Sequence, residues 1–404
     1  MINWILLIIF FCFFELYAFQ GLKIISNNKT VNFLFTFLVF LIMVNMAYQI
    51  IVFDREVGFT HYLSYSIGLF IALFIFQLTI VSALFIEDIK RFFQLVYRYF
   101  IDTENEKLFP RRRKFISQIA FLIGAIPFTG LVYGMIHGKY NYKVLNYSLK
   151  FDDLPNEFDG FTITQISDIH CGSLDNKEKV KYGIDLINKQ KSDVILFTGD
   201  LVNNKSEEAF LWIDIFKELK APYGKFSILG NHDYGDYADW DSDKEKNENM
   251  NLFKEIQKKI GFNLLLNESK YVRKGNDKIA IVGVENWGRS FKKAGDLDKA
   301  VSKINKNDFK ILLTHDPTHW EAKVLDHKFS FPLTLSGHTH GMQFGIEIPG
   351  IIKWSPIKWS YKQWAGIYNK RNKYLNVNRG FGYLAYPGRV GIYPEISVIT
   401  LRSS

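Results

Sequence analysis

The chain has 404 residues, a length that suggests more than one structural unit, and its hydrophobic fraction of 48% is ordinary for a globular protein. The net charge of +9 would suit a nucleic-acid partner, but much of the basic excess flanks apolar runs and no nucleic-acid-reading motif is present, so nucleic-acid binding is not expected. The two cysteines, Cys12 and Cys171, exclude a disulfide framework and leave the redox compartment open.

Long apolar runs in the first third predict an all-α transmembrane bundle of about four helices over residues 1–140. The runs are Trp4 to Phe19, Val31 to Phe53, Leu63 to Ile86 and Phe115 to Ile136. The last three are long enough to cross about 30 Å of hydrocarbon as helices. The first is shorter, but no basic residue precedes it and no clear cleavage site follows, so we interpret it as an uncleaved span rather than a signal peptide. We expect its Glu15 to face another helix or the interface.

Basic residues predict the orientation of these spans. The densest cluster near any span lies between the third and fourth, and it should be cytoplasmic. It comprises Lys90, Arg91, Arg98, Lys107 and the run Arg111 to Lys114. Lys23 and Lys29 fall on the same side by counting. We therefore expect a multi-pass protein of the cell (inner) membrane, with the large domain after Ile136 in the periplasm or outside the cell.

Residues 141–404 predict a domain of layered α/β structure, because short β-rich runs alternate with stretches of helical spacing. The predicted strands are Phe161 to Ser167, Asp193 to Thr198, Lys225 to Leu229, Ile279 to Val284, Phe309 to Thr314, Pro332 to Ser336, Lys373 to Asn378 and Glu395 to Leu401. The predicted helices are Glu178 to Gln190, Glu207 to Lys220, Leu252 to Ile260 and Leu297 to Ile304. The charged stretch Asp236 to Asn251 is expected to be a surface loop.

Residues of metal-ligand type follow five of these strands. The fragments are Asp168-Ile169-His170, Gly199-Asp200, Gly230-Asn231-His232-Asp233, Thr314-His315-Asp316 and Gly337-His338-Thr339-His340. Each alone is common at a turn or on a surface. Five of them, each after an apolar strand, indicate one shared site, because ligand sites collect at the carboxyl ends of strands. The neighbouring glycines allow the sharp turns that such a site needs.

The ordered motifs between Phe161 and His340 resemble those of the calcineurin-like metallophosphoesterase family. A membrane-associated branch of that family pairs the first motif with the pattern LP-x-x-F-x-G, found here as Leu154 to Gly160. The closing segments Asn378 to Gly382 and Pro394 to Ile396 also fit this branch. The resemblance implies an α/β/β/α metallophosphoesterase sandwich and a hydrolase that acts on phosphoric ester bonds.

The resemblance also implies a site with two metal ions. Its members would be Asp168, His170 and His340 on the first metal, Asn231, His315 and His338 on the second, Asp200 bridging both, and His232 as a catalytic residue that binds no metal. Carboxylate and imidazole ligands suit two divalent ions of Mn, Fe or Zn better than Ca. A hydroxide shared by the metals would attack phosphorus, while His232 would stabilise phosphoryl charge or protonate the leaving oxygen.

Several nearby residues are open to two readings. Asp233 could orient His232 or serve a turn, while Asp316 and Thr339 are expected to support the site without binding metal. His319 and Cys171 are expected to be structural. The aromatic and basic segment Trp354 to Trp364 could contact lipid headgroups or pack beside the site.

The leading hypothesis is a membrane-anchored phosphoesterase that prefers a phosphodiester or a pyrophosphate. Its expected partners are membrane lipids and a phosphoester substrate, which in one version of the hypothesis is linked to a lipid. A narrower alternative is hydrolysis of a nucleotide-linked lipid A precursor of the UDP-2,3-diacylglucosamine type, which the predicted orientation opposes. A catalytically silent membrane receptor or scaffold is a third hypothesis, disfavoured because no motif residue is missing. Transport by the helices finds little support in a single acidic residue.

Overall fold

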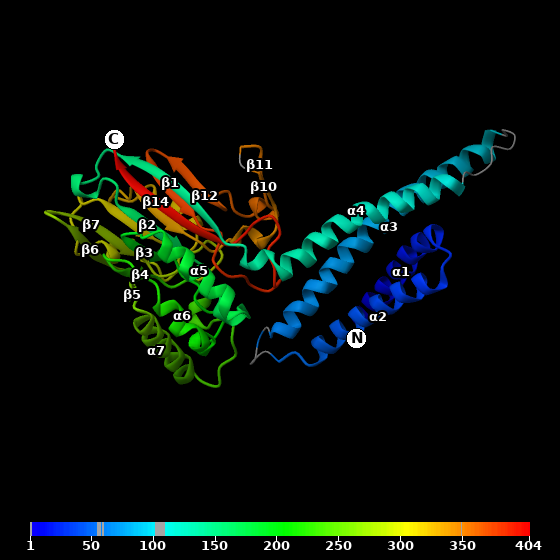
Figure 1. Cartoon of the computed structure of the whole chain (residues 1–404), viewed down its shortest axis with the longest axis horizontal. Coiled ribbons are helices and arrows are strands. Elements are labelled where there is room, and N and C mark those ends of the chain that lie inside the picture. The colour runs from blue at the N-terminus through cyan, green and yellow to red at the C-terminus, as the bar shows by residue number, and fades with distance from the viewer. Residues whose placement is uncertain (1, 55–57, 59, 102–109, 349) are drawn as a thin grey trace. The chain divides into compact units, whose positions relative to one another are not determined.

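The computed structural model describes residues 2–54, 58, 60–101, 110–348 and 350–404 (Figure 1). The side chains of residues 2–10, 12, 101, 110 and 111 are also outside this description, so the expectations that rest on Trp4, Cys12, Lys107 and Arg111 fall outside it. The chain divides into two compact units, Met1–Phe53 with Tyr62–Met135 and Asp54–His61 with Ile136–Ser404. Each unit is considered by itself.

The first unit is helical. Its helices are α1 (Ile2–Ile25), α2 (Lys29–Ile51), α3 (His61–Ile101) and α4 (Pro110–Ile136). Among the described residues, three stretches are long and apolar enough to cross a membrane, namely 29–51, 61–100 and 112–136. The three longer predicted spans are thereby confirmed, and the first segment is helical within α1.

Helix α3 corrects one detail of the prediction. It has 41 residues, which at 1.5 Å per residue is about 60 Å, roughly twice the thickness of the hydrocarbon core. Lys90, Arg91 and Arg98 therefore lie on a continuation of this helix rather than in a loop. There Arg91 pairs with Glu87 at 2.9 Å.

Polar side chains in the first unit find partners on neighbouring helices. Gln77 Nε2 on α3 donates a hydrogen bond to the carboxylate of Glu15 on α1, so Glu15 faces another helix as expected. Asn45 Nδ2 on α2 donates to Ser66 Oγ on α3 at 2.6 Å. Such bonds are the usual way in which polar groups are satisfied between membrane helices.

The second unit is built on two sheets. In the part of it that the structure describes, each sheet has six strands, with the orders β1-β14-β2-β3-β4-β5 and β12-β13-β9-β8-β7-β6. The first, sheet A, contains β1 (Lys143–Phe151), β2 (Thr162–Ile166), β3 (Val194–Phe197), β4 (Lys225–Ser227), β5 (Asn263–Leu264) and β14 (Glu395–Ser403). The second, sheet B, contains β6 (Glu268–Lys274), β7 (Asp277–Gly283), β8 (Lys310–Leu313), β9 (Leu333–Ser336), β12 (Gly366–Lys370) and β13 (Lys373–Val377). A separate hairpin pairs β10 (Ile346–Ile348) with β11 (Ile352–Trp354).

The two sheets pack face to face, and helices cover their outer faces. Apolar residues of both sheets form one buried core between them, including Ile163, Leu196, Ile311 and Leu333. Helices α5 (Lys177–Lys189), α6 (Ile213–Lys217) and α7 (Asp243–Ile260) contribute to a second core on sheet A. Helix α8 (Leu297–Ala300) and the turn Trp320–Val324 form a third on sheet B. The layers are those of the predicted α/β/β/α sandwich.

The loop predicted over Asp236 to Asn251 is wrong in its second half, because α7 already begins at Asp243. Ser242 Oγ accepts a hydrogen bond from Glu245 N at 3.3 Å and caps the helix, and Gly261, with a φ of 91°, ends it. Two other helices are shorter than predicted. Residues 206–212 form a 3-10 helix before α6, and α8 ends at Ala300.

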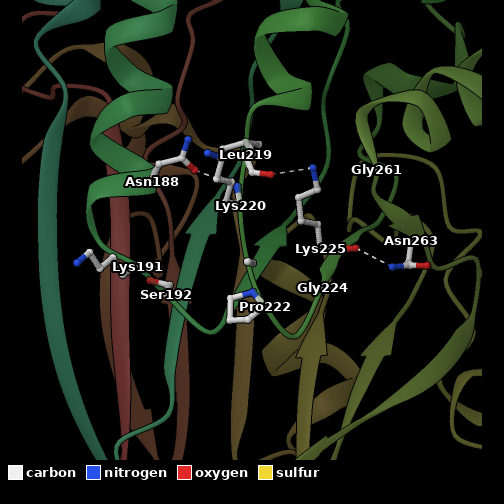
Figure 2. Close-up of a pocket in the computed structure, with 11 residues that line it drawn as sticks. Asn188, Lys191, Ser192, Leu219, Lys220, Pro222, Gly224, Lys225, Gly261 and Asn263 are labelled. Carbon is white, nitrogen blue, oxygen red and sulfur yellow. Dashed lines mark hydrogen bonds between the residues drawn. The ribbon is translucent and has the colours of Figure 1, made fainter.

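A surface cavity of about 680 Å³ lies at the beginning of strands β3 and β4 (Figure 2). Lys225 Nζ already donates to the carbonyl oxygens of Leu219 and Ile260 at 3.0 and 2.7 Å, and Asn263 Nδ2 donates to the Lys225 carbonyl at 3.1 Å. These bonds close helix ends and strand edges. The cavity is at the opposite end of the strands from the metal-type motifs, so the site must be sought elsewhere.

Candidate metal centre

The five motifs follow strands that lie side by side. Strands β2, β3 and β4 are parallel neighbours in sheet A, and β8 and β9 are parallel neighbours in sheet B. Their carboxyl ends therefore open at the same edge of the sandwich. The predicted site residues all occupy the loops that leave this edge.

The backbone of these loops is strained at five of the candidate metal ligands. The φ angles are 50° at Asp168, 51° at His170, 60° at Asp200, 73° at His338 and 50° at His340. Residues with a Cβ rarely adopt this left-handed region, because each instance costs about 1–3 kcal/mol and persists only where the surrounding structure enforces it. Such strain clusters at functional sites, and here it turns side chains inward at the strand ends.

The first group of candidate ligands comprises Asp168, His170 and His340, which are all buried and offer ligand atoms within 4.8 Å of one another. Nε2 of His170 is 3.0 Å from Nε2 of His340, and Nε2 of His340 is 3.2 Å from Oδ1 of Asp168. Both oxygens of Asp168 also accept from the His338 backbone N–H at 3.0 Å.

The second group comprises Asp200, His315 and His338, again within 4.8 Å. Nε2 of His315 is 3.0 Å from Oδ2 of Asp200 and 3.2 Å from Nδ1 of His338. Asn231 joins this group, since its Oδ1 is 2.8 Å from Nδ1 of His338 while its Nδ2 donates to Tyr237 Oη at 2.9 Å. The amide oxygen of Asn231 is therefore the atom that faces the cluster.

Asp200 and His232 connect the groups. Oδ2 of Asp200 is also 3.7 Å from Nε2 of His170 in the first group, and its Oδ1 accepts from the His232 backbone N–H at 2.9 Å. The ring of His232 stands edge-on to that of His170, with centroids 5.0 Å apart. Its Nδ1 is 2.7 Å from the carbonyl oxygen of Asn203, which can only accept, so Nδ1 carries a proton and Nε2 is left for other chemistry.

The donor set fits metal cations. Two imidazole nitrogens that face each other at 3.0 Å can share only one proton, and buried carboxylate oxygens stand beside them. His315 Nδ1 lies 2.8 Å from the Thr198 carbonyl oxygen and must donate to it, which leaves Nε2 with a lone pair when the ring is neutral. In the part of the chain that the structure describes, lone-pair atoms thus converge in two adjacent groups, as divalent-metal sites require.

Electrostatics in the cluster are strongly coupled. Burial acts to lower the pKa of His315, but the Asp200 carboxylate outweighs it and raises that pKa to about 10. Burial acts to raise the pKa of Asp200, yet His315 holds it well below its usual range. A cation that binds here would displace the His315 proton, so affinity should increase with pH.

Several supporting residues hold these loops in place. The buried Asp233 carboxylate accepts from the backbone N–H groups of Asp200, Leu201, Val202 and Gly230, so it serves the turn rather than orienting the His232 ring. Asp316 Oδ1 accepts from Thr318 N and Oγ1 at 2.8 and 2.7 Å, and Thr339 Oγ1 donates to the Trp364 carbonyl at 2.6 Å. The Asp316 bonds close a local turn, whereas the Thr339 bond ties the loop after β9 to the distant residue Trp364.

The remaining doubtful residues also have structural contacts. His319 is buried, stacks on Trp287 and is 2.9 Å from Thr314 Oγ1, and burial lowers its pKa to about 3. Cys171 packs in the buried core beneath sheet A. In the segment Trp354 to Trp364 the two ends differ, because Trp364 is buried while Trp359 is 75% exposed.

Three neighbours of the cluster were missed from sequence. Tyr361 Oη is 2.8 Å from His338 Nε2, Asn203 Oδ1 is 3.0 Å from His170 Nδ1, and Arg389 Nη2 is 3.3 Å from His340 Nδ1. Asn203 stands three positions after Asp200 in the same loop, which was a usable signal. Tyr361 lies in the segment Trp354 to Trp364, for which packing beside the site was one of the two interpretations, whereas Arg389 comes from a segment with no motif of its own.

Comparison with known proteins finds two matching family models and several relatives. Residues 161–342 match the family model "Calcineurin-like phosphoesterase", and residues 1–139 match "Probable Calcineurin-like phosphoesterase, transmembrane domain". The chain is 30% identical to the uncharacterized metallophosphoesterase YkuE of Bacillus subtilis, over 72% of this chain and 98% of that protein. It is 25% identical to an uncharacterized metallophosphoesterase of Helicobacter pylori, over 96% and 95% of the two chains.

The name of another relative mentions a membrane. A transmembrane protein with metallophosphoesterase domain from Danio rerio is 25% identical over 68% of this chain and 60% of that protein. Together with the apolar helices α2, α3 and α4, these matches make the chain a membrane protein. The sandwich fold, the metal-type clusters at its strand ends and the extent of the matches together place the chain in the calcineurin-like metallophosphoesterase family.

Proposed function

We propose that this chain is a binuclear metal-dependent hydrolase of phosphate esters, with a phosphodiester or pyrophosphate as its preferred substrate. The observation that carries the proposal is the pair of ligand groups joined by the Asp200 carboxylate. Asp168, His170 and His340 would hold one ion, Asn231, His315 and His338 the other, and Asp200 both. Divalent ions of Mn, Fe or Zn bound there would act as Lewis acids that activate water and neutralise phosphoryl charge.

His232 is proposed as the catalytic residue that binds no metal. Its Nδ1 is held by the Asn203 carbonyl, and its ring is only half-buried, so Nε2 can reach a phosphoryl or leaving oxygen. A protonated Nε2 there would stabilise developing charge or protonate the leaving group. Asn231 contributes a neutral ligand, which keeps the site less negative toward an incoming phosphate anion.

The membrane helices support a substrate at or in a bilayer, such as a lipid-linked phosphoester. The basic cluster at the end of α3 and the start of α4 supports a cytoplasmic position for that end of the helices. The catalytic domain would then be periplasmic or extracellular, in a multi-pass protein of the cell membrane.

The test is the bridging carboxylate. Asp200→Asn should abolish hydrolysis of bis(p-nitrophenyl) phosphate by the full-length protein and lower its metal content toward one ion or none. Asp193→Asn is the matched control, because Asp193 stands at the opposite end of β3, where it accepts from Thr162 N and Oγ1. Two ions and near-parental turnover in Asp200→Asn would contradict the bridging role.

A further inference from the structure

The hairpin β10–β11 turns its apolar side chains to solvent. Ile351, at its tip, is 80% exposed, and Ile346, Ile348 and Ile352 are exposed as well. In the described part of the second unit beyond Ile136, every exposed isoleucine belongs to this hairpin. Figure 1 shows the hairpin apart from the two main sheets. An apolar surface of this kind usually marks an interaction site.

In a strand at the surface of a soluble domain, the apolar face normally packs on the domain and the polar face meets solvent. In this hairpin the arrangement is reversed. The register pairs Ile348 with Ile352, and Glu347 with Lys353 on the other face. That other face is the one bonded to the domain, because Glu347 pairs with Arg379 at 2.6 Å and the Lys353 amine donates to the Ala365 carbonyl oxygen. The polar residues therefore attach the hairpin, and the isoleucines are left for something outside the domain.

The chemistry beside the hairpin favours a lipid surface over a protein. The 3-10 helix Pro356–Trp359 follows β11 directly and presents Trp359, 75% exposed and edge-on to Trp354 at 6.2 Å. The exposed Lys358 and Lys362 lie on either side of Trp359 in the sequence. Aliphatic side chains with an adjacent tryptophan and lysines are the composition of elements that lie in the headgroup region of a bilayer.

A short stretch of chain connects this surface to the last apolar helix. Helix α4 ends at Ile136, and Gly138 packs so closely on the Arg389 carbonyl oxygen that a Cβ there would lie 2.1 Å from it. The next residue along, Val390, pairs with the base of the hairpin, and its carbonyl oxygen accepts from Gly345 N at 2.9 Å. Arg389 thus contacts the chain just after its last apolar helix, and the next residue, Val390, contacts the base of the hairpin. A tether this short keeps the effective concentration of the bilayer at the hairpin high.

We propose that the hairpin β10–β11 and the adjoining Trp359 form a docking surface that inserts into the bilayer carrying the chain's own helices. Because Tyr361, two residues beyond Trp359, contacts His338, the docked segment also lines the metal centre. The same short stretch of chain then places the mouth of the site at the headgroup level.

The full-length protein in nanodiscs of phosphatidylcholine and phosphatidylglycerol tests this surface, with brominated acyl chains as the quencher of tryptophan fluorescence. Trp359→Phe should lose part of the quenching that the parent shows. Trp320→Phe, which removes an indole that is 1% exposed in the core, should lose none. Ile351→Asp should lose the same part as Trp359→Phe, while Ile351→Leu should keep it.

Equal quenching of the parent and Trp359→Phe would overturn the proposal and leave the surface to a protein partner. If Ile351→Asp showed the same quenching as the parent, the hairpin would not be part of the docking surface. Quenching is read without turnover, so a protein that hydrolyses no phosphoester would still give a decisive answer.

Discussion

At the scale of single residues, the site depends on glycines that make room for carboxylates. A Cβ on Gly230 would lie 2.1 Å from Asp200 Oδ1, and a Cβ on Gly337 would lie 2.2 Å from Asp168 Oδ2. Neither glycine has a positive φ, so the requirement is space rather than backbone freedom. The motif glycines thus protect the positions of the two aspartates.

Gly230→Ala should therefore damage the site more than the fold. The new methyl group must displace the Asp200 carboxylate, so we expect metal content and hydrolysis of bis(p-nitrophenyl) phosphate to fall toward the levels predicted for Asp200→Asn. Overpacking of this kind costs about 1–3 kcal/mol, which should appear as a modest decrease in melting temperature. Metal analysis and thermal unfolding of the same sample separate the two effects. Full metal occupancy with parental activity would show that the loop can relax.

His232→Ala should retain both metals and the fold yet reduce kcat by about 10²–10⁴, the range for a general acid or a comparable charge stabiliser. Proton donation makes a sharper claim about leaving groups. The loss should be large for an alkoxide, which needs a proton, and much smaller for p-nitrophenolate. Equal losses for both would leave only charge stabilisation, and lost metal would make His232 a ligand.

At the scale of elements, sequence patterns predicted the apolar strands but missed the charged first turns of a helix. Four short strands are buried, namely β2, β3, β8 and β9. Because buried strands are apolar, their sequences could be recognised as strands. The first turns of α7 are charged and touch the core through the polar Asn249, which bonds Ser206. No hydrophobic period marks such a segment. The motif residues could be predicted because each follows a strand, whereas Tyr361 reaches His338 through an irregular segment whose path no local pattern encodes.

The hairpin β10–β11 carries its own functional prediction. Ile351→Asp should weaken hydrolysis of a phosphodiester embedded in a bilayer while leaving soluble bis(p-nitrophenyl) phosphate unaffected. Burying an isoleucine contributes about 1.5–3 kcal/mol, so the loss should be on the order of tenfold or more. Parallel assays in nanodiscs and with the soluble substrate measure the ratio, with Ile351→Leu as the control. A matched loss on both substrates would mean that the change acts on the site itself.

At the scale of the whole molecule, the orientation of the helices decides which substrates are available. A C-terminal alkaline phosphatase fusion should be active in cells, and a green fluorescent protein fusion exported by the general secretory route should be dark. Both report the compartment of the domain, because each reporter folds on only one side of the membrane. The reverse pattern would place the domain in the cytoplasm and restore the nucleotide-linked lipid precursor as a candidate substrate.

The strand order of sheet A has a consequence for biosynthesis. Strand β14 lies between β1 and β2, although it is synthesised after every other strand of the domain. Strand β1 pairs with β14 along its whole length, Lys143 to Phe151, and β2 meets it on the other side. Until residues 395–403 emerge from the ribosome, β1 therefore lacks its partner among the described strands of sheet A, and the side of β2 that β14 will cover is an open edge. Open strand edges of this kind can pair with other chains, so the nascent domain is exposed to aggregation until its last strand is in place.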